Sequence, residues 1–200
     1  MDQFVYLASQ SPRRRQLLEQ LGVRYELLLP EADEDTEALE AVLDNEAPAR
    51  YVKRVTGLKL DAASARLMRR RLPPAPILSA DTTVALGRTI YGKPDDTRHA
   101  ERQLSELSGK THRVLTAVNI GSGQERFFAL SSSQVSFEPM TAEQISRYAA
   151  TGEPLGKAGA YAIQGRVSMH ITRICGSYSG IMGLPFWETA SLLRAAGFAI

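Results

Sequence analysis

The sequence predicts an α/β fold in which helices flank a long mixed β-sheet. Strand-like and helix-like segments alternate in the first half of the chain, and strand-like segments cluster in its middle. The composition is that of a globular protein, since 44% of the 200 residues are hydrophobic and 23% are charged. This length fits one domain with a sizeable core, and we place no boundary within residues 1–200.

The elements of the first half follow from local patterns. Residues 4–8 are an apolar run that predicts a buried strand, and residues 25–29 predict a second strand. Residues 12–21 predict a helix, because proline stands at its start and a glycine follows its last residue. Residues 49–68 predict a long helix, although Gly57 weakens it in the middle.

The second half is predicted to supply most of the sheet. Asp or Thr stands in a capping position before two of its helices, and proline opens the last helix. Cys175 and Trp187 are both expected to be buried. The expected strands are residues 77–86, 111–120, 126–137 and 169–174, and the expected helices are residues 96–107, 141–150 and 185–196.

Charge and cysteine content narrow the class of protein. Lys and Arg number 24 against 22 Asp and Glu, which is too even for a stable nucleic-acid partner, although the basic run at residues 69–71 leaves polymer binding as an alternative. Cys175 is the single cysteine, which excludes an intramolecular disulfide and a thiolate zinc cluster. Apolar runs fall short of the roughly 18 residues that span a bilayer. The N-terminal charges follow the apolar stretch, the reverse of a secretory signal, so we expect a cytoplasmic protein without a membrane partner.

The segment SQSPRRR at residues 9–15 predicts an anion site at the start of a helix. Ser11 suits the N-cap position, yet arginines follow where acidic residues are favoured, at a cost of about 0.3–1 kcal/mol each. A bound phosphate would reverse that sign, because it accepts hydrogen bonds from free backbone N–H groups and from guanidinium groups. An exposed basic turn is the alternative interpretation.

Asp81 interrupts an apolar strand in the segment SADTTV. A buried carboxylate is costly unless it is paired or used, so Asp81 is a candidate metal ligand or general base. Asp33, Glu34 and Asp35 could add oxygen ligands of the kind that Mg²⁺ prefers. A structural role for Asp81 and solvated loop positions for the other three are the alternatives.

Two glycine-containing segments are further candidates for ligand contact. Lys93 lies in a turn in the segment YGKP, and residues 156–165, GKAGAYAIQG, form a loop of small residues that would let a ligand approach the backbone closely. Neither the P-loop pattern nor the dinucleotide-binding pattern occurs, so the standard nucleotide loops do not apply.

Six segments occur in the order of one known family and extend over nearly the whole chain. They are LASQSPRRRQLLEQLG, SADTTV, YGKP, LSGKTHRVLTAV, GEPLGKAGAYAIQG and GSYSGIMGLP. Together they resemble the Maf family of nucleotide pyrophosphatases, named for septum-formation inhibition. The resemblance implies a two-lobed α/β fold similar to the inosine-triphosphate pyrophosphatases, with the active-site cleft between the lobes. It also implies hydrolysis of nucleoside triphosphates to monophosphate and pyrophosphate, a divalent cation such as Mg²⁺ or Mn²⁺, and a homodimer as a family expectation.

Two short motifs assign the chain to one branch of this family. Asp81-Thr82 and Ile163-Gln164-Gly165 resemble the branch specific for dTTP and UTP. The branch specific for 7-methyl-GTP, which is the alternative, tends to carry Asp-Gln and a Glu before the glycine. By this resemblance Asp81 matches the proton acceptor, and Arg13, Thr82 and Gln164 match the specificity positions.

The residues themselves are consistent with this branch. The imide edge of uracil or thymine offers an acceptor oxygen beside a donor N–H, and the amide of Gln164 offers the complementary pair. A flipped amide would satisfy cytosine as well. Gln164 therefore excludes CTP only if its neighbours fix its orientation.

The resulting hypothesis assigns a role to each candidate. The cation lies between the carboxylates and the triphosphate, Asp81 takes a proton from the attacking water, and the basic side chains neutralise phosphate charge. A non-catalytic nucleotide-binding regulator of cell division is the competing hypothesis, and metal-dependent turnover discriminates the two. The candidates are Asp81, Lys59 and Lys93 for catalysis, Ser9, Ser11, Arg13, Arg14, Thr82 and Gln164 for substrate binding, and Glu34 with Asp81 for the metal.

Overall fold

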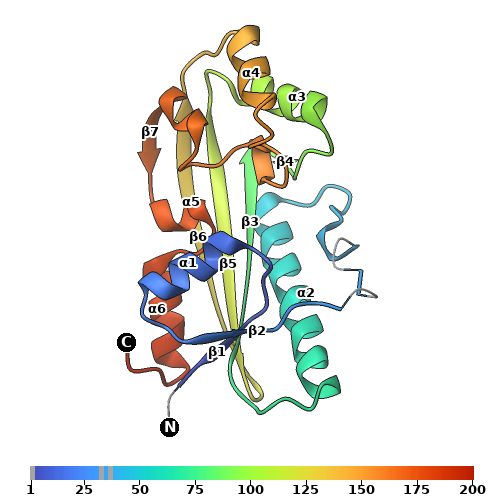
Figure 1. The fold of residues 1–200 in the computed structure, drawn as a ribbon, viewed down its shortest axis with the longest axis vertical. Coiled ribbons are helices and arrows are strands. Elements are labelled where there is room, and N and C mark those ends of the chain that lie inside the picture. Colours follow the sequence, from blue (N-terminus) through green and yellow to red (C-terminus); the bar gives the residue numbers. More distant parts are fainter. Residues whose placement is uncertain (1–2, 32–33, 36–37) are drawn as a thin grey trace.

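The computed structural model, which describes residues 3–31, 34–35 and 38–200, has a mixed seven-stranded sheet (Figure 1). The strand order is β2-β1-β3-β5-β6-β7, and β4 pairs with β3 beside that path. β1 runs parallel to β2 and β3, and the other pairs are antiparallel. The predicted mixed sheet is therefore confirmed. The strands are β1 (Val5–Leu7), β2 (Tyr25–Leu27), β3 (Ile77–Leu86), β4 (Thr89–Tyr91), β5 (Thr111–Ser122), β6 (Glu125–Phe137) and β7 (Ile171–Cys175).

Helices cover both faces of this sheet (Figure 1). The long helix α2 packs on β3 and β5, while α5 and α6 pack on β5 and β6 and α1 contacts α5. No described helix has the length and apolar content needed to span a membrane. The α-helices are α1 (Pro12–Gln20), α2 (Pro48–Arg69), α3 (Thr97–Leu107), α4 (Ala142–Ala149), α5 (Tyr178–Met182) and α6 (Phe186–Ala195), and the 3-10 helices are η1 (Ala38–Glu40), η2 (Ala158–Ala160) and η3 (Arg166–His170).

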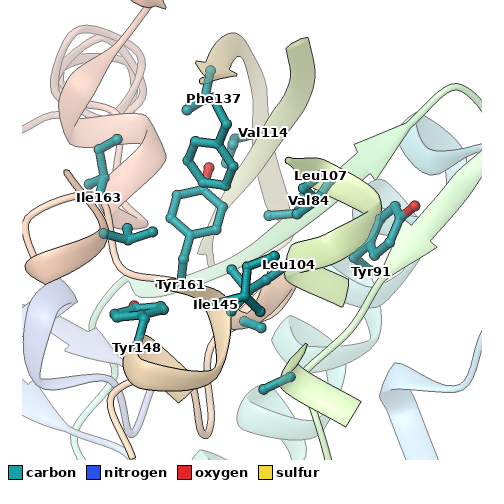
Figure 2. Close-up of a cluster of buried hydrophobic side chains, with 14 of the residues drawn as sticks. Val84, Tyr91, Leu104, Leu107, Val114, Phe137, Ile145, Tyr148, Tyr161 and Ile163 are labelled. Atoms are coloured by element: carbon teal, nitrogen blue, oxygen red, sulfur yellow. The ribbon is translucent and has the colours of Figure 1, made fainter. Parts of the chain in front are cut away.

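Of the four core clusters among the described residues, two lie at opposite ends of the long strands β3, β5 and β6, which makes the molecule two-lobed. One cluster, with Leu104 and Tyr161 at its centre, joins α3, α4 and η2 to one end of these strands (Figure 2). The other, with Leu18 and Leu193, joins α1, α6 and β1 to the opposite end. In Figure 1, α3 and α4 lie at the top, and α1, α2 and α6 lie below them. This arrangement agrees with the expected two-lobed α/β fold.

Some local predictions differ from the structure. Gly57 does not interrupt α2, because the buried side chains of Val52, Val55 and Leu60 hold that helix against the sheet. Trp187 was expected to be buried but is 76% exposed, since α6 packs through other residues of its apolar face. Cys175 is exposed, because it ends the edge strand β7. The short elements β4 and α5 were not predicted.

Candidate active site

A cleft of about 480 Å³ lies between the two lobes. The start of α1 and part of α2 contribute from one lobe, and the segments around β4 and η2 contribute from the other. β3 crosses the cleft and carries the acidic residue that the sequence singled out. The structure brings together nine of the residues predicted from the sequence along this cleft: Ser9, Ser11, Arg13, Arg14, Lys59, Asp81, Thr82, Lys93 and Gln164.

Arg14 ties the start of α1 to the rest of the cleft. Its Nε donates to the carbonyl oxygen of Gly183 at 2.8 Å, and its two terminal nitrogens donate to Ser9 Oγ at 3.1 Å and Thr82 Oγ1 at 3.2 Å. Burial lowers the pKa of Arg14 from its ordinary value. The planar guanidinium group can make all three bonds at once. Arg14 therefore positions three separate segments in addition to carrying charge.

The hydroxyl of Thr82 has a defined hydrogen-bond direction. Thr116 Oγ1 donates to the carbonyl oxygen of Gly180 at 2.7 Å, which uses its single proton. The 3.0 Å contact between Thr82 Oγ1 and Thr116 Oγ1 must then be donated by Thr82. Thr82 in turn accepts from Arg14. The hydroxyl proton of Thr82 is thus already used in the hydrogen bond to Thr116. Only the remaining lone pair of Thr82 Oγ1 is left to accept a hydrogen bond from a ligand.

Lys59 joins two carboxylates at the centre of the cleft. Its ammonium nitrogen lies 2.6 Å from Asp81 Oδ1 and 2.7 Å from Glu40 Oε1. The Asp81 side chain is 10% exposed, so its charge needs such a partner. Thr83 also faces Asp81, with its hydroxyl 3.5 Å from Oδ2. Oxygens of Asp81 and Glu40 therefore converge on one cationic position.

Glu40 also contacts a second lysine of the cleft. Its Oε2 accepts from Lys93 Nζ at 2.8 Å. Burial by itself would raise the pKa of Glu40, but the ammonium groups of Lys59 and Lys93 outweigh burial and hold that pKa below its ordinary value. A carboxylate from η1 thus compensates two of the predicted phosphate-binding cations.

Glu34, the second predicted metal ligand, is not brought to Asp81. Its carboxylate forms an ion pair with Arg66 and accepts from Arg69 at 2.7 Å. The Arg66 guanidinium lowers the pKa of Glu34 to about 2. Asp35 accepts from the backbone N–H of Ala38, and Asp33 lies outside the described residues. A metal-binding role for Glu34 would require Arg66 to release it.

Other side chains in the cleft remain open to a ligand. Gln164 is exposed, and neither its amide nor the hydroxyl of Ser11 bonds to another residue that the structure describes. Arg13 makes one bond, from Nε to the carbonyl oxygen of Met182 at 3.3 Å. Burial lowers the pKa of Lys157, and the positive charge of Arg13 lowers it further. Two cations facing each other in a cleft favour an anion between them.

Comparison with known proteins gives a family for this site. The sequence matches the family model described as Maf-like protein over residues 4–196. The chain belongs to the Maf family. Curated relatives named dTTP/UTP pyrophosphatase include those of a Polaromonas species, 70% identical over 98% of both chains, Albidiferax ferrireducens, 66% identical over 100% of both, and Cupriavidus metallidurans, 61% identical over 98% of both. Among solved structures, the Staphylococcus aureus Ham1 protein matches with a TM-score of 0.44 and 12% identity, covering 68% of this chain and 72% of that chain.

The family resemblance implies a divalent cation, and the carboxylates in the cleft of this Maf protein show whether such an ion could be held there. No group of three or more His, Cys, Asp or Glu side chains is arranged for a metal in the described part of the chain. Asp81 and Glu40 nevertheless hold a common cation, the ammonium of Lys59. One or two carboxylates completed by water and phosphate oxygens suit Mg²⁺. The residues present therefore fit a cation of this type.

Sequence reasoning missed two side chains that line the Maf cleft, Glu40 and Lys157, and a buried one, Thr116, that is hydrogen-bonded to Thr82 of the cleft. Glu40 stands in an acidic segment where no position is distinguished, and Lys157 lies in the small-residue loop without being singled out. Thr116 lies in a strand-like run and gives no signal of its polar role. For Lys157 alone a signal existed, since a lysine directly after a glycine, within a candidate ligand loop, repeats the Gly92-Lys93 pattern.

Proposed function

We propose that the protein hydrolyses dTTP and UTP to the nucleoside monophosphate and pyrophosphate. The observation that carries this proposal is that Asp81, the basic side chains and the amide of Gln164 all line the same cleft. Relatives that are 61–70% identical over nearly the full chain and named dTTP/UTP pyrophosphatase support it.

The basic residues suit the triphosphate. Arg13 and Lys59 from one lobe and Lys93 and Lys157 from the other line the same cleft. The charge of a pyrophosphate leaving group grows in the transition state, and cations fixed in a partly dry site stabilise that charge strongly. The first-turn N–H groups of α1 add donors that have no partner within the helix.

Asp81 is the proposed proton acceptor. It lies in the cleft on a rigid strand, with its charge compensated by Lys59 at 2.6 Å. A water oxygen attacks the α-phosphorus as its proton passes to Asp81, and the bond from that phosphorus to the bridging oxygen breaks to release pyrophosphate. A divalent cation, Mg²⁺ or Mn²⁺, held by Asp81 and Glu40 would neutralise phosphate charge and polarise the reacting groups. Glu34 remains a candidate ligand only if it leaves Arg66.

Gln164 is the proposed reader of the base. Its amide is free of partners among the described side chains and lies in the cleft, so both its donor and its acceptor are available to the imide edge of uracil or thymine. A nucleoside triphosphate substrate also fits the cytoplasmic location expected from the sequence.

A substrate panel tests this function. The protein is incubated with Mg²⁺ or Mn²⁺ and dTTP, UTP, CTP, GTP or 7-methyl-GTP, and pyrophosphate is resolved from orthophosphate. We expect pyrophosphate with dTMP or UMP and little product from the guanine nucleotides. Turnover of 7-methyl-GTP instead would overturn the role of Gln164, and nucleotide binding without any turnover would favour the regulator hypothesis.

A further inference from the structure

Glu153 holds the turn that presents Gln164 to the cleft. Its Oε1 accepts from Tyr148 Oη at 2.8 Å, and its two oxygens accept from the backbone N–H of Arg166 at 3.1 and 3.2 Å. Arg166 begins η3, directly after the turn that the Gly165 N–H closes onto the carbonyl oxygen of Ala162 at 2.8 Å. The carboxylate is thus bonded to the main chain two residues after Gln164.

Gly165 is the residue that admits this carboxylate. A Cβ atom at position 165 would lie 1.8 Å from Glu153 Oε1 and 2.5 Å from its Cδ. Any side chain there would push Glu153 away, so the pairing of Glu153 with the turn depends on glycine. The family motif ends on this glycine, and the structure supplies a physical reason for it.

The other end of the turn is anchored in the core. Tyr161 Oη is hydrogen-bonded to the buried His112 Nε2 at 2.8 Å, and its ring packs edge-on against Phe137 with centroids 5.1 Å apart. Figure 2 shows Tyr161 and Ile163 within the same cluster as Tyr148. Gln164 is therefore the exposed residue of a turn whose flanks are fixed on both sides.

From this geometry we infer that Glu153 is a positioning residue for base selection, acting on Gln164 through the Arg166 backbone. The inference rests on the proposed reading of the base by Gln164. Two simultaneous hydrogen bonds from an amide require placement within about 0.5 Å, and a charged acceptor on main-chain N–H groups fixes a turn more strongly than a neutral one. No phosphate-binding residue of the cleft is hydrogen-bonded to Glu153 among the described residues, although the negative charge of Glu153 acts on Lys157, so the effect of Glu153 is expected mainly on the base half of the substrate.

The test compares Glu153→Ala with binding probes for each half of the substrate. UMP, CMP and pyrophosphate are titrated into the protein by calorimetry. We expect UMP to bind about tenfold more weakly to the variant, the UMP preference over CMP to shrink, and pyrophosphate affinity to stay within about twofold. In turnover, KM for UTP rises while kcat at saturation changes little.

Two variants guard against a purely structural effect. Glu153→Gln keeps one acceptor oxygen and should lose less UMP affinity than Glu153→Ala, whereas Gly165→Ala displaces the carboxylate from the other side and should resemble Glu153→Ala. Glu143→Gln, which removes an exposed ion pair with Arg147 on the neighbouring α4, should bind like the parent protein.

Equal losses of UMP and pyrophosphate affinity, or unchanged UMP affinity in both Glu153→Ala and Gly165→Ala, would overturn the inference. So would a parent protein without any preference for UMP over CMP. Because monophosphate binding needs no turnover, a failure of the hydrolysis assay contradicts the proposed function and not this positioning role.

Discussion

The ammonium nitrogen of Lys59 lies 2.6 Å from Oδ1 of Asp81, and both side chains are largely buried. One residue comes from the middle of α2 and the other from the middle of β3, so the packing of helix on sheet brings the two charges together. A buried carboxylate is tolerated when such a partner compensates it. This pair explains how an apolar strand can carry an acidic residue into the cleft.

Asp81→Asn should abolish turnover while leaving the fold in place. The amide cannot accept the proton of the attacking water, and general-base catalysis contributes about 10²–10⁴-fold, so kcat should fall by that factor. Pyrophosphate release measures the loss, and nucleotide affinity with the circular-dichroism melting curve shows that the cleft persists. Asp61→Asn, at an exposed position of α2, is the matched control. Near-normal turnover in Asp81→Asn would contradict the assignment.

Glu40→Gln should impair the reaction because it removes the carboxylate that Lys59 and Lys93 share. Loss of these charged hydrogen bonds is expected to lower kcat/KM for UTP by about 10–100-fold, and the proposed cation role predicts a higher half-saturating Mg²⁺ concentration. Steady-state kinetics at several Mg²⁺ concentrations measures both effects.

The control for Glu40 lies in the same segment of the chain. Glu46 pairs with Arg54 at 2.7 Å and contacts no lysine of the cleft. The Glu46→Gln variant should therefore have the same half-saturating Mg²⁺ concentration as the parent protein. If the two variants behaved alike, Glu40 would contribute only to anchoring the segment.

The long helices and strands, and the site residues that lie within them or at their starts, could be predicted from the sequence because each is marked by a pattern of neighbouring residues. Asp81 is recognisable as an acid within an apolar strand, and Arg13 and Arg14 are recognisable as basic residues at a helix start. The two lobes and the cleft between them followed from the family resemblance, and the separate core clusters and the lining of the cleft agree with them. The nine residues that share the cleft could be named without coordinates for this reason.

Ion pairs between residues that are far apart in the sequence could not be predicted in the same way. Glu40 and Lys93 are 53 positions apart, and no periodic pattern marks one acid among many in a loop. Glu34 stands in the same acidic stretch, yet its partner is Arg66 on the far part of α2. Trp187 shows the same limit for burial, since helical spacing does not say which apolar residue faces the sheet.

Arg14 and Arg13 should respond differently to replacement by lysine. Arg14→Lys loses the planar group that bonds Gly183, Ser9 and Thr82 at once, so the free energy of unfolding should fall by about 1–3 kcal/mol. That loss corresponds to a Tm lower by several degrees in a chain of this length. Arg13→Lys should leave Tm nearly unchanged and lower kcat/KM instead. Equal Tm values for both variants would contradict the positioning role of Arg14.

His112 should make the protein less stable as the pH falls from 6.5 to about 4. Burial lowers the pKa of His112 from 6.5 to about 4, so within this window the unfolded chain takes up a proton that the folded chain refuses. The stability from neutral His112 is complete above pH 6.5 and is lost as the pH falls to about 4, a change of about 3 kcal/mol. Urea unfolding at a series of pH values measures it.

His112→Gln isolates this contribution, because the amide can still bond Tyr161 but does not titrate. Both proteins keep His99, His170 and every carboxylate, so the difference between their stability curves reports position 112 alone. We expect the two curves to be parallel above pH 6.5, and the parent protein to lose about 3 kcal/mol relative to the variant as the pH falls to about 4. Curves that stayed parallel down to pH 4 would mean that the folded protein protonates His112 as readily as the unfolded chain does. The bond between His112 and Tyr161, which anchors the turn of Gln164, would then have to survive that protonation.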